Sequence, residues 1–441
     1  MPLGSGAVAR RTAATSRYAA RFRCIGAACE DNCCAHSWQV LLDRQDYGRL
    51  KAALAASPQG QATFERGCVR TPGAGARDRR YAALQRTPDG RCVFLALDGL
   101  CSVHTTHGTA ALPGVCATYP RVLTEAGEHL SLTATLSCPE AARLCLLAED
   151  AARLEAAQPE ALAPYRVRHR LPVSSADPFV RHVQAIRAAF LELIAMRDYP
   201  LASRFYFTVQ LARRLDAARA ARGRGAQDAA VREAISACGT AKVLAALDRE
   251  CRGAAVSGLL PVTLVRQILI AVLRGQRATR FGALVHAVCG PHLEADAGRA
   301  PRRGARRRGD EWQRAHDLRR RRWEGEFPDR SEQYATNYAA DYWMRDPFPA
   351  SPDLVGFVLD LLARVGVIRF LLFGHPSLQG SDEQGSSPAL RRQALDHAAV
   401  EVVYTFSRAV EHSAELRGLL HALISQHRLR GRRSALELAR F

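Results

Sequence analysis

The chain has 441 residues, of which 48% are hydrophobic, and its formal net charge is +19. This length can bury one large hydrophobic core or two to three ordinary ones, and the composition excludes a disordered or fibrous protein. The charge indicates anionic partners, but 60 of the 62 cations are arginine and no series of stacking aromatic residues accompanies the densest arginine run. We therefore expect an acidic protein rather than nucleic acid as the partner.

Residues 1–20 are expected to form a flexible N-terminus. They contain several arginines but no apolar segment of signal-peptide length. The most hydrophobic stretch, Val355 to Phe373, is interrupted by Asp360, Arg364 and Arg369. An amphipathic helix tolerates these charges, whereas a membrane span does not. The sequence thus predicts a cytoplasmic protein without membrane contact.

Residues 21–145 are expected to form a cysteine-rich lobe. Ten of the 13 cysteines precede residue 146, and the segment is irregular, with a Gly/Pro-rich stretch at 71–80. The apolar run "CVFLAL" at 92–97 predicts a small strand. We expect a loop-rich lobe organised around its thiols.

Helical periodicity dominates from about residue 139, and residues 146–441 are predicted to be an α-helical body. Asp177 and Pro178 are typical of a helix start, and apolar residues from Phe179 to Ile194 then recur at three- and four-residue steps. Further helices are expected at roughly 200–222, 226–252, 260–275, 331–345, 352–373, 388–411 and 413–428. The fold class is therefore mainly α, with the cysteine-rich lobe packed on the helical body.

An arginine-rich linker is expected near 299–322. It carries ten arginines between Arg302 and Arg322, together with three acidic residues and two glycines. Such a run most often forms a solvated linker or an exposed helix face, and less often a docking surface for an acidic protein or nucleic acid.

The thiols are the most informative side chains. The stretch "CIGAACEDNCCAHSW" at 24–38 holds four cysteines, and four more follow at wider spacing; the eight are Cys24, Cys29, Cys33, Cys34, Cys92, Cys101, Cys116 and Cys138. In a reducing cytosol, clustered cysteines more often bind a metal or do redox chemistry than form disulfides. Four thiolates complete one tetrahedral zinc site or hold one [4Fe-4S] cluster.

The spacing alone does not decide between zinc and iron. The pattern CxxxxCxxxCC lacks the CxxC knuckles of common zinc ribbons, which disfavours zinc without excluding it. His36, His104 and His107 could also ligate a metal, although each alone is more often an ordinary surface residue. The other cysteines are as readily explained as small buried hydrophobic residues; they are Cys68, Cys145, Cys238, Cys251 and Cys289.

Several motifs resemble the flagellin lysine N-methylase family of bacteria. They are "FRCIGAACEDNCCAHSWQVLLDRQDY", "CVFLALDGLCSVHTTHG", "LPGVCATYPR" and "LSLTATLSCPEAARLCL", followed more weakly by "SEQYATNYAADYWMRDPFP" at 331–349 and "YTFSRAVEHSAEL" at 404–416. The resemblance implies S-adenosylmethionine-dependent methylation of flagellin lysines. It also implies an iron-sulfur cluster, whose ligands would be drawn from the eight cysteines named above.

Neither of two familiar S-adenosylmethionine motifs is present. The "GSG" at 4–6 does not join a strand to a helix, as a Rossmann glycine-rich turn would. A CxxxCxxC motif of radical enzymes is incomplete, because His36 stands where the third thiolate would be expected. The alternative function is a non-catalytic zinc- or iron-binding module for protein interaction.

Methylation by polar transfer would require an apolar channel or a nearby base, because a lysine amine has a pKa of about 10.4 and must lose a proton before it attacks a methyl group. Polar residues within the resembling motifs are Glu30, Asp31, Tyr119 and Glu411. Asp31 and Tyr119 are the catalytic candidates. Each also has a structural explanation, since Asp31 could cap a turn and Tyr119 could anchor the loop before Pro120.

Overall fold

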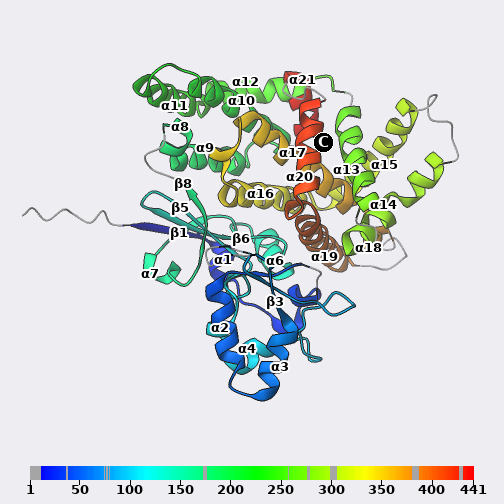
Figure 1. Cartoon of the computed structure of the whole chain (residues 1–441). Coiled ribbons are helices and arrows are strands. Elements are labelled where there is room, and N and C mark those ends of the chain that lie inside the picture. Colours follow the sequence, from blue (N-terminus) through cyan, green and yellow to red (C-terminus); the bar gives the residue numbers. More distant parts are fainter. Residues whose placement is uncertain are drawn as a thin grey trace, which may run out of the picture.

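A five-stranded sheet lies between a small cysteine-rich lobe and a large helical body (Figure 1). The computed structural model describes residues 11–35, 38–73, 75, 78, 80–171, 176–256, 258–275, 279–297, 305–379, 387–426 and 431–441. Helices make up most of these residues. The prediction of a mainly α protein with a loop-rich lobe packed on a helical body is confirmed.

The central sheet has the strand order β7-β1-β6-β5-β8. Its strands are β1 (Thr12–Ser16), β5 (Arg121–Ala126), β6 (His129–Ala134), β7 (Leu154–Ala157) and β8 (Val167–Leu171). The pairs β1/β6 and β5/β8 are parallel, and the others are antiparallel. β5 and β6 form a hairpin whose turn contains Gly127 at φ 62°, a left-handed conformation that favours glycine.

The N-terminal segment differs from the expected flexible end. From Thr12 onward it is strand β1 followed by helix α1 (Arg17–Arg21), whereas residues 1–10 lie outside the described residues. Tyr18 anchors this segment, because its ring is fully buried and its hydroxyl donates to the Ala134 carbonyl at 2.7 Å. The partners of β1 are more than 100 residues away in sequence, which explains why local pattern did not reveal the strand.

The cysteine-rich lobe has its own small core. Its elements are η1 (Gly26–Ala28), η2 (Cys33–Ala35), β2 (Leu41–Leu42), α2 (Arg44–Leu54), α3 (Pro58–Gly67), β3 (Cys68–Arg70), β4 (Ala82–Leu84), α4 (Ser102–His107), η3 (Thr109–Ala111) and α5 (Gly114–Thr118). Leu42, Leu50, Phe64 and Phe94 fill the core. The strand expected at 92–97 is absent from the described structure, which has only isolated bridges at Cys92 and at Leu95.

The remaining helices build the body. They are α6 (Pro139–Leu147), α7 (Pro159–Leu162), α8 (Pro178–Arg181), α9 (Val183–Ala195), α10 (Leu201–Arg219), α11 (Arg224–Cys238), α12 (Ala241–Gly253), α13 (Leu259–Gly275), α14 (Arg280–Ala297), α15 (Ala305–Glu326), α16 (Pro328–Arg345), η4 (Phe348–Ala350), α17 (Leu354–Phe373), α18 (Pro376–Gln379), α19 (Pro388–Phe406), the π-helix η5 (Ser407–Glu411), α20 (Ala414–Gln426) and α21 (Arg432–Arg440). The predicted start of α8 is confirmed, because the Asp177 carboxylate accepts from the Phe179 amide at 3.0 Å. The single helix expected at 226–252 is instead two helices that break at Gly239.

Helix α17 was expected to be amphipathic, but it is buried on nearly every side. All of its residues except Asp360 are buried, as is usual for a helix that is apolar on every side. Its cations remain tolerable because they are paired: Arg364 donates to Asp360 at 2.6 Å, and Arg369 donates to Glu324. Among the helices of the described residues, none combines the length and hydropathy needed to cross a membrane.

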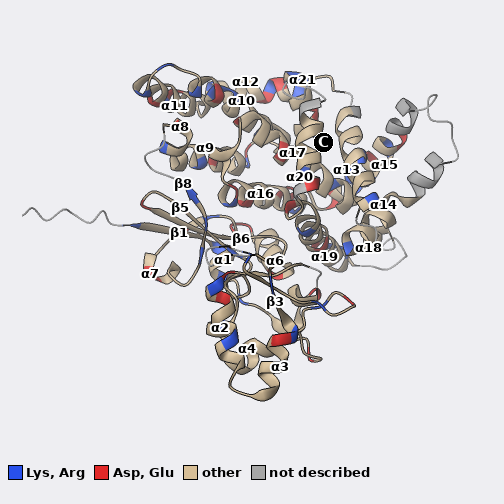
Figure 2. Ribbon diagram, viewed as in Figure 1, with Lys and Arg blue, Asp and Glu red and all other residues tan. Residues whose placement is uncertain are grey.

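The arginine-rich segment is largely helical rather than a linker. Residues 298–304 lie outside the described residues, and α15 begins at Ala305. Trp312 and Trp323 bury one side of this helix in the main core. Figure 2 shows Lys and Arg spread over the lobe and the body, with Asp and Glu among them.

The expected domain boundary at 145/146 falls within α6. Tyr18 and Phe22 from the first segment and Leu146 from α6 belong to the same hydrophobic core as the body helices. The second core, in the cysteine-rich lobe, includes Cys92. Two cores therefore meet close to the cysteines.

Candidate active site

The cysteine loop, residues 24–35, lies on the segment that carries Cys92 and Cys101. Asn32 fixes the loop, since its amide donates to the Gly99 carbonyl at 2.6 Å and its oxygen accepts from the Cys34 amide at 2.8 Å. The Cys92 amide in turn donates to the Cys34 carbonyl at 2.8 Å. The hydrogen bonds from Asn32 to Gly99 and from Cys92 to Cys34 thus hold residues that are some 60 positions apart at one place on the lobe.

The structure brings seven of the eight predicted ligand thiols into one region. Cys29, Cys33, Cys34, Cys92, Cys101, Cys116 and Cys138 lie close enough for the charge on one thiol to raise the pKa of another. Cys138 belongs to the core of the body, whereas Cys92 belongs to the core of the lobe. Cys24 is exposed at the start of the loop. The thiols therefore lie where the two cores meet.

Cys33 and Cys34 form a hydrogen-bonded pair of unequal acidity. The pKa of Cys33 is lowered to about 7, first by the hydrogen bond from Cys34 and then by the positive charges of Arg408 and Arg86. The same hydrogen bond and burial raise the pKa of Cys34. The thiolate is the form that ligates metals, and the positive charges of Arg408 and Arg86 favour it at Cys33.

The donor chemistry of this region fits a soft or borderline metal, because thiolates suit zinc and iron-sulfur centres. Within the described residues, no three His, Cys, Asp or Glu side chains are close enough together to hold a metal ion. The thiols are thus gathered but have not converged on one point.

Arg408 of the π-helix η5 connects the cysteine loop to the body. Its guanidinium contacts the Asp31 carboxylate at 2.8 Å and donates to the Asp31 carbonyl at 2.8 Å. It also donates to the Ser137 carbonyl at 2.6 Å. The guanidinium lies over two aromatic rings, 5.6 Å from the centroid of Trp38 and 5.1 Å from that of Tyr404. This cation thus joins the loop to the segment that leads into Cys138.

A hydroxyl network surrounds Ser137, which is fully buried. The Ser137 hydroxyl lies 3.1 Å from the Tyr119 hydroxyl, 3.1 Å from His412 Nε2 and 3.0 Å from Thr135 Oγ1. The ring of Trp38 packs against both other rings, with centroids 5.6 Å from Tyr119 and 5.2 Å from His412. His412 itself is exposed. The network therefore extends from a buried serine to a histidine that solvent can reach.

A buried ionic network holds the end of the π-helix. Glu411 accepts a hydrogen bond from the Tyr338 hydroxyl at 2.9 Å and lies 3.0 Å from Arg345 and 3.7 Å from Arg364. Burial acts to raise the pKa of Glu411, but the two arginines outweigh it and lower that pKa. Burial raises the pKa of Asp341, another partner of Arg345, to about 6. This ionic network therefore fixes the end of the π-helix, an element that often occurs at functional sites.

The predicted catalytic candidates both lie in this region. Asp31 is paired with Arg408, and Tyr119 joins the Ser137 network, where burial raises its pKa. Glu30 instead pairs with Arg143, and Glu411 is buried in the ionic network. The catalytic roles of Asp31 and Tyr119 stay predictions.

The histidines proposed as additional ligands stay predictions as well. His104 is exposed on α4 and lies 3.1 Å from Thr109 Oγ1, and His107 is at the end of the same helix. His36 lies outside the described residues. The cysteines interpreted as packing residues are buried, as expected; they are Cys68, Cys145, Cys238, Cys251 and Cys289.

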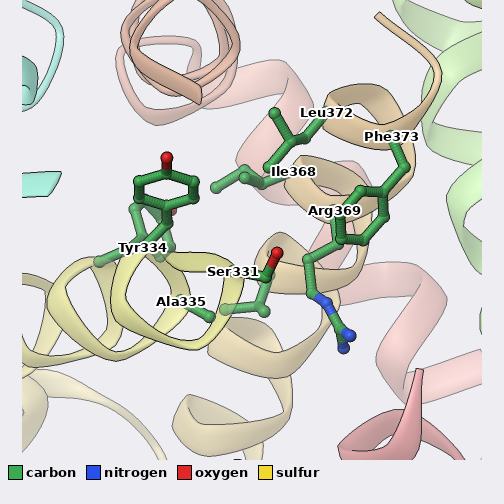
Figure 3. A pocket seen from close by; sticks show the side chains of 9 residues that line it. Ser331, Tyr334, Ala335, Ile368, Arg369, Leu372 and Phe373 are labelled. Atoms are coloured by element: carbon green, nitrogen blue, oxygen red, sulfur yellow. The ribbon is translucent and has the colours of Figure 1, made fainter. Parts of the chain in front are cut away.

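A small cavity between α16 and α17 is separate from these groups. Ser331 and Tyr334 on one helix and Ile368, Leu372 and Phe373 on the other face it (Figure 3). Its volume of about 10 Å³ is room for about one water molecule. It is therefore too small for a lysine side chain or a nucleoside cofactor.

Sequence reasoning missed Arg408, His412, Ser137 and Trp38 as site residues. A signal existed, because all four lie within the motifs that carry the family resemblance. Arg408 and His412 are four residues apart, which suits one face of a π-helix, and Ser137 directly precedes Cys138. Only the fold, however, places His412 beside Ser137.

Comparisons with known proteins show that the chain is similar to lysine N-methylases. A family model described as the FliB lysine N-methylase C-terminal domain matches residues 187–437, which is more than half of the chain. A curated protein from Salmonella typhimurium strain LT2, named lysine-N-methylase, is 28% identical over 139 residues. That alignment covers 31% of this chain and 33% of the relative, so it spans about a third of the relative's length. No solved structure matches the chain.

Proposed function

Because the chain belongs to the FliB lysine N-methylase family, we propose that it is an enzyme that methylates lysine side chains of flagellin, with S-adenosylmethionine as the methyl donor. The match over residues 187–437 carries this proposal. The matched part contains the π-helix η5 and His412. Arg408 of η5 contacts Asp31 of the cysteine loop and the Ser137 carbonyl, and His412 contacts the Ser137 hydroxyl. The family domain thus supplies one wall of the candidate active site.

We also propose that thiolates from the cysteine-rich lobe hold a [4Fe-4S] cluster. The ligands would be drawn from the eight predicted cysteines, and the gathering of seven of them where the two cores meet supports this choice. When bound, such a cluster supplies an iron atom able to coordinate the methionine part of the donor. Within the loop, Cys29 follows one short turn, and Cys33 and Cys34 lie in another, rather than in long helices.

The protein's own residues have separate tasks in this proposal. Arg408 holds the cysteine loop on the body and places a positive charge beside the thiols. Trp38 and Tyr119 present aromatic rings next to the Ser137 network. Aromatic faces attract cations such as a lysine ammonium or a sulfonium, and they exclude water from the place where the methyl group is transferred.

The proposal is tested with anaerobically purified protein, flagellin and isotopically labelled S-adenosylmethionine. We expect mass spectrometry to find label on flagellin lysines, and elemental analysis to find iron and sulfide in near-equal amounts with little zinc. Replacing Cys33 by alanine is expected to abolish both the visible absorbance of the cluster and the methyl transfer.

The matched control is Cys238→Ala, because Cys238 is buried in α11 and faces the core of the body. This variant should keep the cluster and the activity, apart from a modest loss of stability. Stoichiometric zinc without sulfide, together with no labelled lysine, would favour the alternative of a non-catalytic metal-binding module. Equal losses in the two variants would indicate that Cys33 serves folding rather than a metal site.

A further inference from the structure

A lysine amine is protonated at neutral pH, since its pKa is about 10.4. Its nitrogen has no lone pair for attack on a methyl sulfonium until a base removes that proton. Two carboxylates near the cysteine loop are engaged by arginines, because Asp31 contacts Arg408 and Glu30 contacts Arg143. A neutral nitrogen base would be better suited, provided that a substrate can reach it.

His412 meets these requirements by its position. It is exposed, and it follows the π-helix η5 directly. Its Nε2 lies 3.1 Å from the hydroxyl of fully buried Ser137, which also contacts the Tyr119 hydroxyl at 3.1 Å. When Ser137 accepts a hydrogen bond from Nε2–H, the ring has its lone pair on Nδ1. Within the described residues, Nδ1 has no hydrogen-bond partner, so it is available to a substrate.

The surroundings favour the neutral form of this ring. Burial of part of the ring lowers the pKa of His412, and the positive charges of Arg345, Arg168 and Arg417 lower it further. These arginines come from α16, β8 and α20 respectively. Glu411 acts in the opposite direction, but its charge is already compensated by Arg345 and Arg364.

We infer that His412 is the base that removes the proton from the substrate lysine, and that Ser137 and Tyr119 are positioning residues that orient its ring. This inference rests on the proposed function. The lysine ammonium gives its proton to Nδ1, which leaves a neutral amine and an imidazolium. The amine lone pair then forms the N–C bond as the C–S bond of the sulfonium donor breaks, and that bonding pair stays on sulfur. The methylated ammonium and a neutral thioether are the products.

The test is the pH dependence of single-turnover methyl transfer in His412→Ala. For the unaltered protein, the rate should reach a plateau by about pH 7, because the base form of His412 is then complete. In the variant, the rate at neutral pH should fall by about 10²- to 10⁴-fold. It should then keep rising about tenfold per pH unit toward the lysine pKa of about 10.4. Added imidazole should restore part of the lost rate.

His421→Ala is the matched control, because His421 is exposed on α20, the next helix along the chain. It should keep the rate and the plateau of the unaltered protein. NMR spectroscopy of His412 gives a readout that does not depend on turnover. In the unaltered protein, titration should give a pKa below the usual 6.5. In Ser137→Ala, the tautomer of the His412 ring should change.

The possible results separate the two proposals. If the unaltered protein transfers no methyl group to flagellin, the proposed function fails and the inference fails with it. If the unaltered protein is active and His412→Ala keeps both its rate and its plateau, the inference alone is overturned. A variant that loses activity at every pH, without rescue by imidazole, would also overturn the inference, because loss of a base is compensated when the lysine deprotonates by itself.

Discussion

Glu411 is a charged side chain in the interior, with only 4% of its surface exposed. Burial of a carboxylate is costly unless charged partners and hydrogen bonds compensate it, and here Tyr338, Arg345 and Arg364 do so. The neighbouring residue is His412, and Arg408 is one turn earlier. The ionic network therefore fixes the segment that presents both side chains to the cysteine-rich lobe.

Replacing Glu411 by glutamine should destabilise the protein strongly. The change leaves Arg345 and Arg364 buried with one negative charge fewer, which typically costs about 3 kcal/mol or more in the free energy of unfolding. Urea denaturation measures this change. The control is Glu155→Gln, because the Glu155–Arg17 pair is half exposed and should contribute less than about 1 kcal/mol. Equal effects of the two substitutions would show that the buried network does not hold the fold.

At the level of residues, the sequence identified the reactive side chains but not the residues that contact them. The thiols and Asp31 could be singled out because cysteines and carboxylates are sparse and crowded into one loop. Arg408 could not, because arginine is abundant throughout the chain and its contact with Asp31 spans 377 positions. The spacing of side chains along the sequence carries no information about contacts of this range.

Glu401 connects several elements of the body. On α19, it accepts a hydrogen bond from Arg280 of α14 at 2.9 Å and lies 3.4 Å from His375, which directly precedes α18. Arg280 also lies over the ring of Tyr404, one turn further along α19. The hydrogen bond with His375 and the charge of Arg280 lower the pKa of Glu401 from 4.5 to about 2. The carboxylate thus stabilises the folded protein only while it is ionised.

The stability lost in Glu401→Gln should depend on pH. Because the folded pKa is depressed, the contribution of Glu401 is fully present above about pH 4.5 and is lost as the pH falls toward about 2. We expect the variant to lose about 1–3 kcal/mol at neutral pH. The difference from the unaltered protein should shrink steadily in denaturation experiments below about pH 4.5. Glu415→Gln, at an exposed position on α20, should show no such trend. A difference that stays constant with pH would contradict the ion-pair explanation.

Element prediction succeeded where local pattern determines structure. Helix α8 has a capping aspartate and a proline in its first turn, so its start was visible in the sequence. The strands β1 and β7 were missed because their small and polar residues, such as Thr12 and Glu155, form no hydrophobic alternation. They become strands only because β6 and the body provide a sheet on which to pair. The burial of α17 on every side likewise depends on the surrounding helices.

On the scale of the whole molecule, the candidate active site is an interface between two cores. Cys92 is packed in the core of the lobe and Cys138 in that of the body, and the cysteine loop lies over both. Arg408 of the body contacts the carboxylate and the carbonyl of Asp31 across this interface, and on its own side it donates to the carbonyl of Ser137. Together with the Glu30–Arg143 pair, this arginine therefore fixes the position of the loop relative to His412.

Replacing Arg408 by methionine should loosen the cysteine loop without unfolding the body. Methionine keeps much of the apolar contact with Trp38 and Tyr404 but removes the polar contacts with Asp31 and Ser137. Hydrogen exchange followed by mass spectrometry should show faster exchange in peptides from residues 24–35, by about tenfold or more, because each lost charged hydrogen bond contributes about 1.5–3 kcal/mol. Exchange in α10, deep in the main core, should be unchanged. The control is Arg417→Met, since Arg417 is exposed on α20. If exchange of the cysteine loop stays the same in Arg408→Met, other contacts hold the loop, such as the Glu30–Arg143 pair, and the two cores are not coupled through this arginine.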